Sequence, residues 1–191
     1  MSMLRLKLIV FFFISATTIV FGQDAFDQEL QPEPLKKLLK FNIINPSIEW
    51  QIPNSDRNLV AINIGVGYQV SYPSLTESFQ SGGVFLLTPF LDVQNRVYIN
   101  REKLGIKRKV TSNNSGAFIT SRFLIRGKEI ESTVVRTSNI DMAFGLGYGF
   151  QKSKKRINFA FTICPYLYFD SKGNFGFFPF IPEFGIGYNL D

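Results

Sequence analysis

The sequence predicts an all-β fold, a closed antiparallel transmembrane β-barrel of eight strands with up-and-down connections. Three observations carry this prediction. Long stretches alternate large apolar residues with small or polar ones, which is the side-chain period of a β-strand. The small faces are rich in glycine, which recurs in three copies of Gly-x-Gly-Tyr at residues 65–68, 145–148 and 185–188. In the strands that hold these copies, the face that carries the large apolar residues contains no charged residue.

The glycine-rich faces decide which side of the sheet points inward. A water-exposed strand face made of glycine forms strands poorly, whereas the inside of a small barrel has little room and accepts small residues. We therefore expect the large apolar face to meet lipid, where a Lys or Arg at mid-membrane costs about 2 to 4 kcal/mol. The barrel should be closed, because hydrocarbon offers no partner to an open sheet edge. Tyr68, Tyr148 and Tyr188 are expected to form an aromatic girdle at the membrane interface.

The N-terminal residues are set apart from the fold. Arg5 and Lys7 precede an apolar run that ends at Gly22, a pattern typical of a signal peptide over residues 1–22. An uncleaved anchor is the alternative, but the run is interrupted by polar residues and is short against the roughly 20 residues of a spanning helix. Residues 23–36 are polar, contain two prolines and are expected to form a flexible leader, and residues 37–191 form the expected barrel domain.

Seven strands are predicted directly, in the order Leu38–Ile52, Asn58–Tyr72, Gly83–Asn100, Gly116–Arg126, Ile140–Phe150, Ile157–Phe169 and Phe178–Leu190. In the first, the apolar set changes parity at Asn45-Pro46, which suggests a β-bulge. Bacterial barrels have an even number of strands. The motif copies are spaced by 80 and then 40 residues, which places a missing strand between Pro73 and Ser138, with Lys128–Thr137 and Leu104–Thr111 as candidates.

Strand parity also places polar side chains inside the barrel, where charges must pair or stay hydrated. The expected interior network consists of Glu49, Asp92, Gln94, Arg96, Tyr98, Arg122, Asp141 and Glu183. One hypothesis is a salt-bridge plug that closes or gates a narrow conduit. The favoured interpretation is a filled core in which these polar groups satisfy one another.

The composition argues against most catalytic chemistry. The chain has no histidine and one cysteine, Cys164, so it has no internal disulfide and no Ser-His pair for nucleophilic catalysis. The Gly-x-Gly-x-Gly run at residues 145–149 lies within a predicted strand with no helix after it, which is not a nucleotide-binding context. We therefore expect no enzyme activity, cofactor or metal. Two basic clusters, residues 101–109 and 152–156, are interpreted as solvated turns rather than a nucleic-acid surface.

Four short motifs stand out along the chain: Asn45-Pro46-Ser47-Ile48-Glu49, Arg96-x-Tyr98-x-Asn100, Asn114-Ser115-Gly116 and Gly147-Tyr148-Gly149-Phe150-Gln151. Through them the chain resembles a group of small, mostly uncharacterised outer-membrane β-barrel proteins of Gram-negative bacteria. Its ending is similar to the assembly signal of such proteins, which here consists of Phe184, Ile186, Tyr188 and Leu190, although the chain finishes on Asp191 where a terminal aromatic residue is common. The resemblance implies a location in the outer membrane, with lipid and the barrel assembly machinery as partners.

The expected function is that of an integral outer-membrane protein, a monomer with a largely filled interior and a structural or loop-mediated interaction role whose outside partner is unknown. A narrow gated pore or transporter is one alternative. A soluble, exported, lipocalin-like binding barrel is the second. A requirement for detergent, and a shift in gel mobility on boiling, distinguish the membrane protein from the soluble one.

Overall fold

The computed structural model describes residues 33–68, 86–101, 113–132 and 138–190. The regular elements in these ranges are nine β-strands: β1 (Leu38–Asn42), β2 (Ser47–Pro53), β3 (Asn58–Tyr68), β4 (Leu86–Tyr98), β5 (Gly116–Arg126), β6 (Glu131–Ser132), β7 (Asp141–Lys154), β8 (Ile157–Asp170) and β9 (Phe175–Asn189). None of the described residues belongs to a helix long and apolar enough to cross a membrane. The expected signal peptide, residues 23–32 of the expected leader and Asp191 lie outside the described residues.

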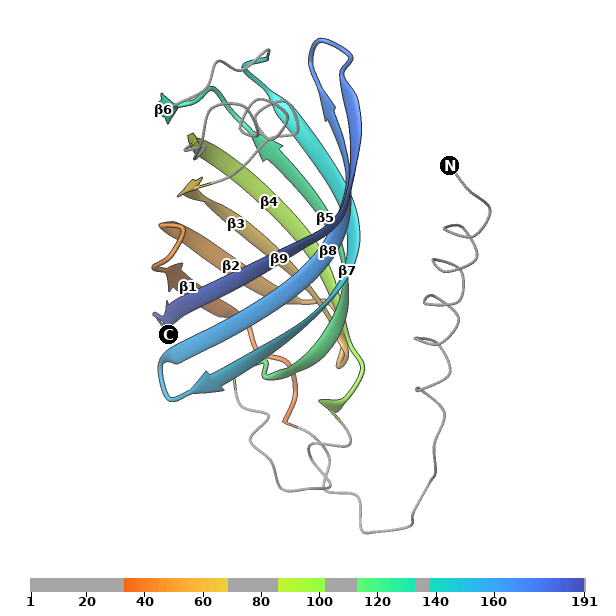
Figure 1. Ribbon diagram of the computed structural model, residues 1–191. Helices are drawn as coiled ribbons and strands as arrows, with labels where there is room; N and C mark the ends of the chain where they lie inside the picture. Colours follow the sequence, from red (N-terminus) through yellow and green to blue (C-terminus); the bar gives the residue numbers. More distant parts are fainter. Residues whose placement is uncertain (1–32, 69–85, 102–112, 133–137, 191) are drawn as a thin grey trace, which may run out of the picture.

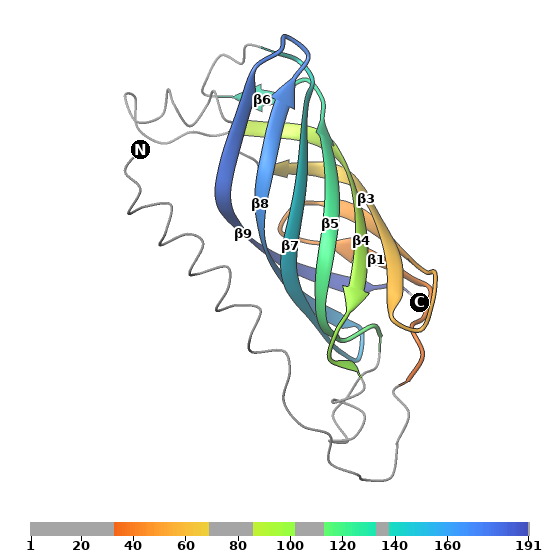
Figure 2. The same cartoon turned by 90° about the vertical axis from the view of Figure 1, so that its right-hand side faces the viewer.

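Eight of the strands form a ring (Figure 1, Figure 2). The sheet order is β3-β2-β1-β9-β8-β7-β5-β4, and β3 also pairs with β4, which closes the circle. Every pairing is antiparallel and joins strands that follow one another in the chain, apart from the first and last. The all-β class, the antiparallel up-and-down arrangement and the number of eight ring strands are therefore confirmed.

The eighth strand does not lie where the motif spacing placed it. The parity change at Asn45-Pro46 is a hairpin rather than a bulge, because β1 and β2 pair antiparallel, with Asn42 opposite Ser47. The expected strand Leu38–Ile52 is thus two ring strands. Between the first and second motif copies the described residues contain two further ring strands, β4 and β5, and the rest of the distance includes residues 69–85, 102–112 and 133–137, which lie outside the described residues.

Neither candidate for the missing strand supplies a ring strand in the described residues. Within Lys128–Thr137 the two-residue strand β6 pairs with Leu86 and Leu87 at the start of β4 and extends the sheet there. Leu104–Thr111 lies outside the described residues, as do residues 69–72 and 83–85 at the ends of two expected strands.

The strands are staggered around the ring. A path along paired residues that leaves β7 at Lys154 returns to β7 at Met142, which is 12 residues earlier. In a closed sheet, such a stagger requires the strands to tilt strongly against the ring axis, and the tilt and the strand number together set the width of the interior. The slanted strands in Figure 1 show this tilt.

Side chains alternate between the inside and the outside of the ring. The buried interior positions carry an unusual number of charged and amide groups: Lys40, Glu49, Gln51, Asp92, Gln94, Arg96, Arg122, Arg126, Asp141 and Gln151. The outward positions expose large apolar side chains, among them Phe41, Ile48, Trp50, Ile64, Ile119, Phe144, Leu146, Phe150, Ile157, Phe159, Leu167, Phe184 and Ile186. This distribution is the reverse of that in a water-soluble protein.

One irregularity interrupts the alternation expected over Phe178–Leu190. The register between β8 and β9 shifts between Cys164 and Tyr166. The positions of β9 that point into the ring therefore change parity there. Glu183 faces inward on one side of the shift. On the other side Phe178 is partly buried and packs edge-on against Tyr168, with ring centroids 6.4 Å apart.

The glycines of the second motif copy allow close approach of the neighbouring strand. A Cβ on Gly147 would lie 2.5 Å from the carbonyl oxygen of Ile163, and one on Gly145 would lie 2.6 Å from the Cys164 sulfur. In the third copy, a Cβ on Gly185 would meet nothing nearer than 3.7 Å, whereas one on Gly187 would lie 2.8 Å from Asn42 Oδ1 on β1. In the second copy the space that glycine leaves is thus taken up by β8, and the motif copies are not equivalent.

Candidate functional site

An apolar layer fills the ring at the end where β1 begins and β9 ends. Leu59, Ala61, Tyr98 and Phe118 are buried together there, and Leu35, which precedes β1, packs into the same cluster. The Tyr98 and Phe118 rings lie 5.5 Å apart. This end of the interior therefore contains packed side chains.

Residues 33–36 of the expected leader are held against this end of the ring. The Lys36 backbone nitrogen donates to Asn114 Oδ1 and the Asn114 amide donates back to the Lys36 carbonyl, both at 2.7 Å. Arg101 donates to the backbone carbonyls of Glu33 and, at 3.0 Å, Ser115. Desolvation lowers the pKa of the Arg101 guanidinium, and Tyr98 and Glu33 oppose that shift. The segment before β1 is thereby anchored to the loop that precedes β5.

Above the apolar layer lies an ion-pair cluster centred on Glu49, which we call the Glu49 cluster. Arg96 donates to both carboxylate oxygens of Glu49, at 3.1 and 3.3 Å, and Lys40 approaches at 3.4 Å. Gln51 donates to the same carboxylate at 2.6 Å. Gln151 accepts from Lys40, Gln51 and Arg96 at 2.9, 3.0 and 3.2 Å. Groups from β1, β2, β4 and β7 thus meet across the interior.

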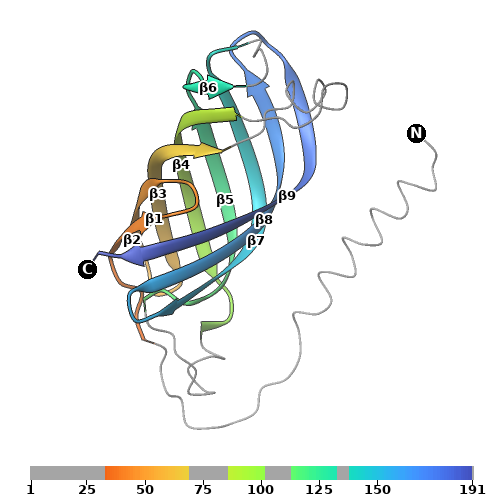
Figure 3. The ribbon, with the colours of Figure 1, turned by 60° about the vertical axis from the view of Figure 1, so that its left-hand side comes forward.

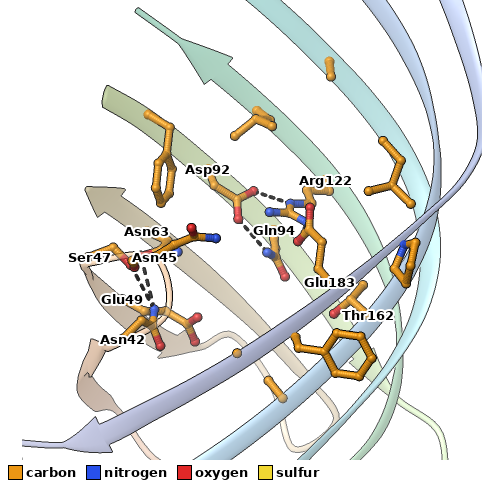
Figure 4. A pocket seen from close by; sticks show the side chains of 18 of the residues that line it. Asn42, Asn45, Ser47, Glu49, Asn63, Asp92, Gln94, Arg122, Thr162 and Glu183 are labelled. Atoms are coloured by element: carbon orange, nitrogen blue, oxygen red, sulfur yellow. Dashed lines mark hydrogen bonds and ion pairs between the residues drawn. The ribbon is translucent and has the colours of Figure 1, made fainter. Parts of the chain in front are cut away.

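A second cluster, the Arg122 cluster, lies further along the interior (Figure 4). Arg122 donates to Asp92 at 2.7 Å, to the Tyr166 hydroxyl at 2.6 Å and to Glu183. Gln94 joins the two clusters, because it donates to Asp92 at 2.7 Å and accepts from Arg96 Nε at 2.8 Å. The two clusters therefore form one continuous polar network.

Asp141 sits apart from these contacts. It pairs with Arg126, which neighbours it across β5 and β7. Both side chains are buried.

A cavity of about 600 Å³ opens beside the Arg122 cluster (Figure 4). One part of its wall is polar and includes Asn42, Ser47, Asn63, Asp92 and Arg122. The other part is aromatic and aliphatic and includes Tyr166, Tyr168, Phe178, Ile181 and Ala160. Figure 4 shows the labelled polar groups from β1, β2, β3 and β4 facing β9 across this space.

The structure brings most of the expected interior residues together. Glu49, Asp92, Gln94, Arg96, Arg122 and Glu183 belong to the two clusters described above. Tyr98 lies in the apolar layer instead, and Asp141 belongs to the separate pair. Sequence reasoning missed Lys40, Gln51, Gln151, Arg126 and Tyr166. All five lie on the inward face of their strands, so strand parity was the signal that could have found them.

The three motif tyrosines do not share one level of the ring, which corrects the expected girdle. Tyr68 is the last residue of β3, while Tyr188 is the last but one of β9, which runs antiparallel to β3. The same motif position is thus carried to opposite ends, and Tyr148 lies near the middle of β7. The Tyr148 and Tyr188 side chains are exposed on the outer face.

The residues of the expected assembly signal also lie on the outer face. Phe184, Ile186, Tyr188 and Leu190 are all exposed, and the first three belong to β9. Leu190 donates its backbone N–H to Leu39 at 2.8 Å. The residues of the expected signal thus lie in and just after the strand that pairs with β1.

Comparisons with protein-family models, with curated proteins and with solved structures find no match to this chain. The site is therefore interpreted from its own geometry. Its charged groups are paired with one another, although several of them, among them Asp92 and Arg122, also line the cavity. No group of three or more metal-ligating side chains occurs among the described residues. What the arrangement offers chemically is a cross-braced interior and one cavity with a polar and an aromatic wall.

Proposed function

We propose that this protein is an integral outer-membrane β-barrel of a Gram-negative bacterium, whose outer face contacts lipid. The observation that carries the proposal is the inverted distribution of side chains, with charges buried inside the ring and large apolar residues exposed outside. Soluble monomers rarely expose such an apolar surface over whole strands. Hydrocarbon favours it, and a ring of strands leaves few backbone groups without partners.

The orientation follows from the ring itself. β1 begins and β9 ends at the same end, since Lys40 pairs with Asn189. With an even number of strands, this end would face the periplasm and the connections after β3 and β5 would face outward. The exported chain would be inserted by the barrel assembly machinery, which would read the outward apolar residues of β9.

Within the membrane the protein would be a structural or loop-presenting protein that does not conduct solutes. The apolar layer and the Glu49 cluster occupy the periplasmic half of the interior and are buried. A water-filled channel would require these groups to separate. Paired charges that satisfy one another stabilise a closed interior and supply no conduit.

Two experiments test these statements. The protein expressed in a Gram-negative host should be extracted only with detergent and should migrate faster on gels before boiling than after. Extraction in plain buffer would instead favour the soluble, lipocalin-like barrel.

The second experiment measures current in planar bilayers for the wild type and for Arg96→Ala, which removes the central cation of the Glu49 cluster. We expect negligible current from both, because the apolar layer remains. Discrete current steps that appear in Arg96→Ala would show that the network is a gate, and steps in the wild type would show an open pore.

A further inference from the structure

The ring is incompletely paired between β9 and the β1–β2 hairpin. β1 is short, and its pairing with β9 ends at Asn42 opposite Gly187. Beyond this pair, Ile43 donates its N–H to the Ile186 carbonyl at 2.8 Å. From Ile181 to Gly185, no strand among the described residues pairs with the edge of β9 that faces β1. Figure 3 shows β9 crossing the ring diagonally and ending below the short hairpin strands in that view.

The composition of this edge suits an opening toward lipid. The Ile186 carbonyl and the Leu190 N–H form backbone hydrogen bonds toward β1. The Asn189 N–H instead donates to the Arg156 carbonyl on the β8 side. By alternation, Pro182 and Phe184 also direct their backbone toward the open side. Proline has no N–H and is confined to edge strands. The unpaired stretch therefore presents a single N–H donor, that of Phe184, where an exposed donor would be costly in hydrocarbon.

The cavity reaches the outer surface at this opening. Three of the residues that line it are also exposed outside: Ile44 in the hairpin turn is 44% exposed, Phe180 is 62% exposed and Phe184 is 58% exposed. They come from the two sides of the opening. The cavity is therefore continuous with the face that would contact lipid.

The walls of the cavity define the chemistry of a ligand. Phe178, Ile181 and Tyr168 offer an apolar and aromatic surface for a hydrocarbon chain. Across from them, Asn42, Asn63 and the other amide and hydroxyl groups offer neutral hydrogen-bond donors and acceptors. The charges in the wall are already paired with one another, as Asp92 and Glu183 are with Arg122. A charged headgroup would therefore find no unpaired opposite charge.

We propose that the opening between β9 and the β1–β2 hairpin admits an acyl lipid with a small, uncharged, hydroxyl-bearing headgroup into the cavity. The proposal rests on the membrane location proposed above. Cavities of roughly 300 to 1,000 Å³ hold molecules of this size. The acyl chain lies against the β8–β9 wall, and the headgroup lies against the amides of β1 and β3.

A fluorescence experiment in lipid vesicles tests this. The protein has one tryptophan, so Trp50→Phe with Phe178→Trp places a single reporter in the cavity wall. Vesicles of phosphatidylcholine receive either a monoacylglycerol or a phosphatidylglycerol, each brominated on the acyl chain, at the same mole fraction. We expect the monoacylglycerol to quench the reporter several-fold more strongly.

Two variants that fill the cavity should remove this preference. Ala160→Phe and Gly185→Leu both add volume at lining positions, and the space at Gly185 is free of close contacts. The matched control is Ile163→Phe on the outward face of β8, which should retain the preference. Gel mobility before and after boiling checks that each variant is folded.

Equal quenching by the two lipids, or quenching that survives both filled variants, would overturn the proposal. A second copy of the chain paired along β9 would also overturn it, and would appear as a disulfide-linked dimer of a Cys164→Ser, Phe184→Cys variant. Protein that does not float with the vesicles contradicts the membrane location itself. Protein that floats but shows no lipid preference contradicts only the lipid site.

Discussion

The guanidinium of Arg96 holds both carboxylate oxygens of Glu49, at 3.1 and 3.3 Å, across the interior of the ring. The two residues lie on β4 and β2, which are separated in the sheet by β3. This two-pronged contact therefore braces strands that are not direct neighbours. Both side chains are almost fully buried, so neither charge can turn to water if its partner is lost.

Removal of the Glu49 charge should destabilise the protein strongly. In Glu49→Gln, Arg96 and Lys40 face one another without their shared anion, and loss of one partner of a buried pair costs about 3 to 5 kcal/mol. Urea unfolding in vesicles, followed by the fluorescence of Trp50, measures this free energy. The exposed Lys154→Gln serves as the control and should change it by about 0.5 kcal/mol or less. A similar small change for both variants would contradict the described network.

The two carboxylates on Arg122 should differ in their contributions. The Asp92 side chain is fully buried, whereas that of Glu183 is 37% exposed. Asp92→Asn should lower the free energy of unfolding by about 3 to 5 kcal/mol, and Glu183→Gln by about 1 kcal/mol or less, because solvent screens that pair. The same urea titration compares them. Equal losses would show that Glu183 is as deeply enclosed as Asp92.

The motif glycines offer a test of the strand packing. Gly147→Ala should destabilise the protein by about 1 to 3 kcal/mol, the usual effect of overpacking, because the added methyl group would meet the Ile163 carbonyl. Gly185→Ala should have little effect, since its nearest neighbour would be at an ordinary contact distance. Thermal unfolding, followed by gel mobility, measures both. A negligible loss for Gly147→Ala would contradict the described contact between β7 and β8, and a large loss for Gly185→Ala would contradict the described space between β8 and β9.

The sequence predicted the interior residues correctly where the two-residue period of a strand was enough to place them. The two-residue period placed Glu49, Arg96 and Arg122 inside the ring because each has the parity opposite to that of the outward apolar residues in its strand. The same rule applies to Lys40, which lies between Leu39 and Phe41 in the expected strand Leu38–Ile52, but Lys40 was not included in the expected network. A parity change at Asn-Pro fits a bulge or a tight hairpin, and only the pairing of β1 with β2 decides between them.

Features that depend on the ring as a whole were beyond sequence reasoning. The levels of Tyr68 and Tyr188 depend on strand direction, and the position of Phe178 depends on a register shift between two strands. The opening beside Pro182 arises because β1 ends at Asn42, opposite Gly187, and leaves the preceding part of β9 unpaired on that side. No local pattern encodes where a neighbouring strand ends.

The central claim, that the outer face meets lipid, is tested most directly by placing arginine at two outward positions of equal exposure. Leu146 lies mid-strand in β7 and is 59% exposed, while Ile157 is the first residue of β8 and is 61% exposed. In vesicles, Leu146→Arg should lower the free energy of unfolding by about 2 to 4 kcal/mol and Ile157→Arg by about 1 kcal/mol or less, because the cost depends on depth. Equal, small changes at both positions would contradict a membrane-spanning barrel.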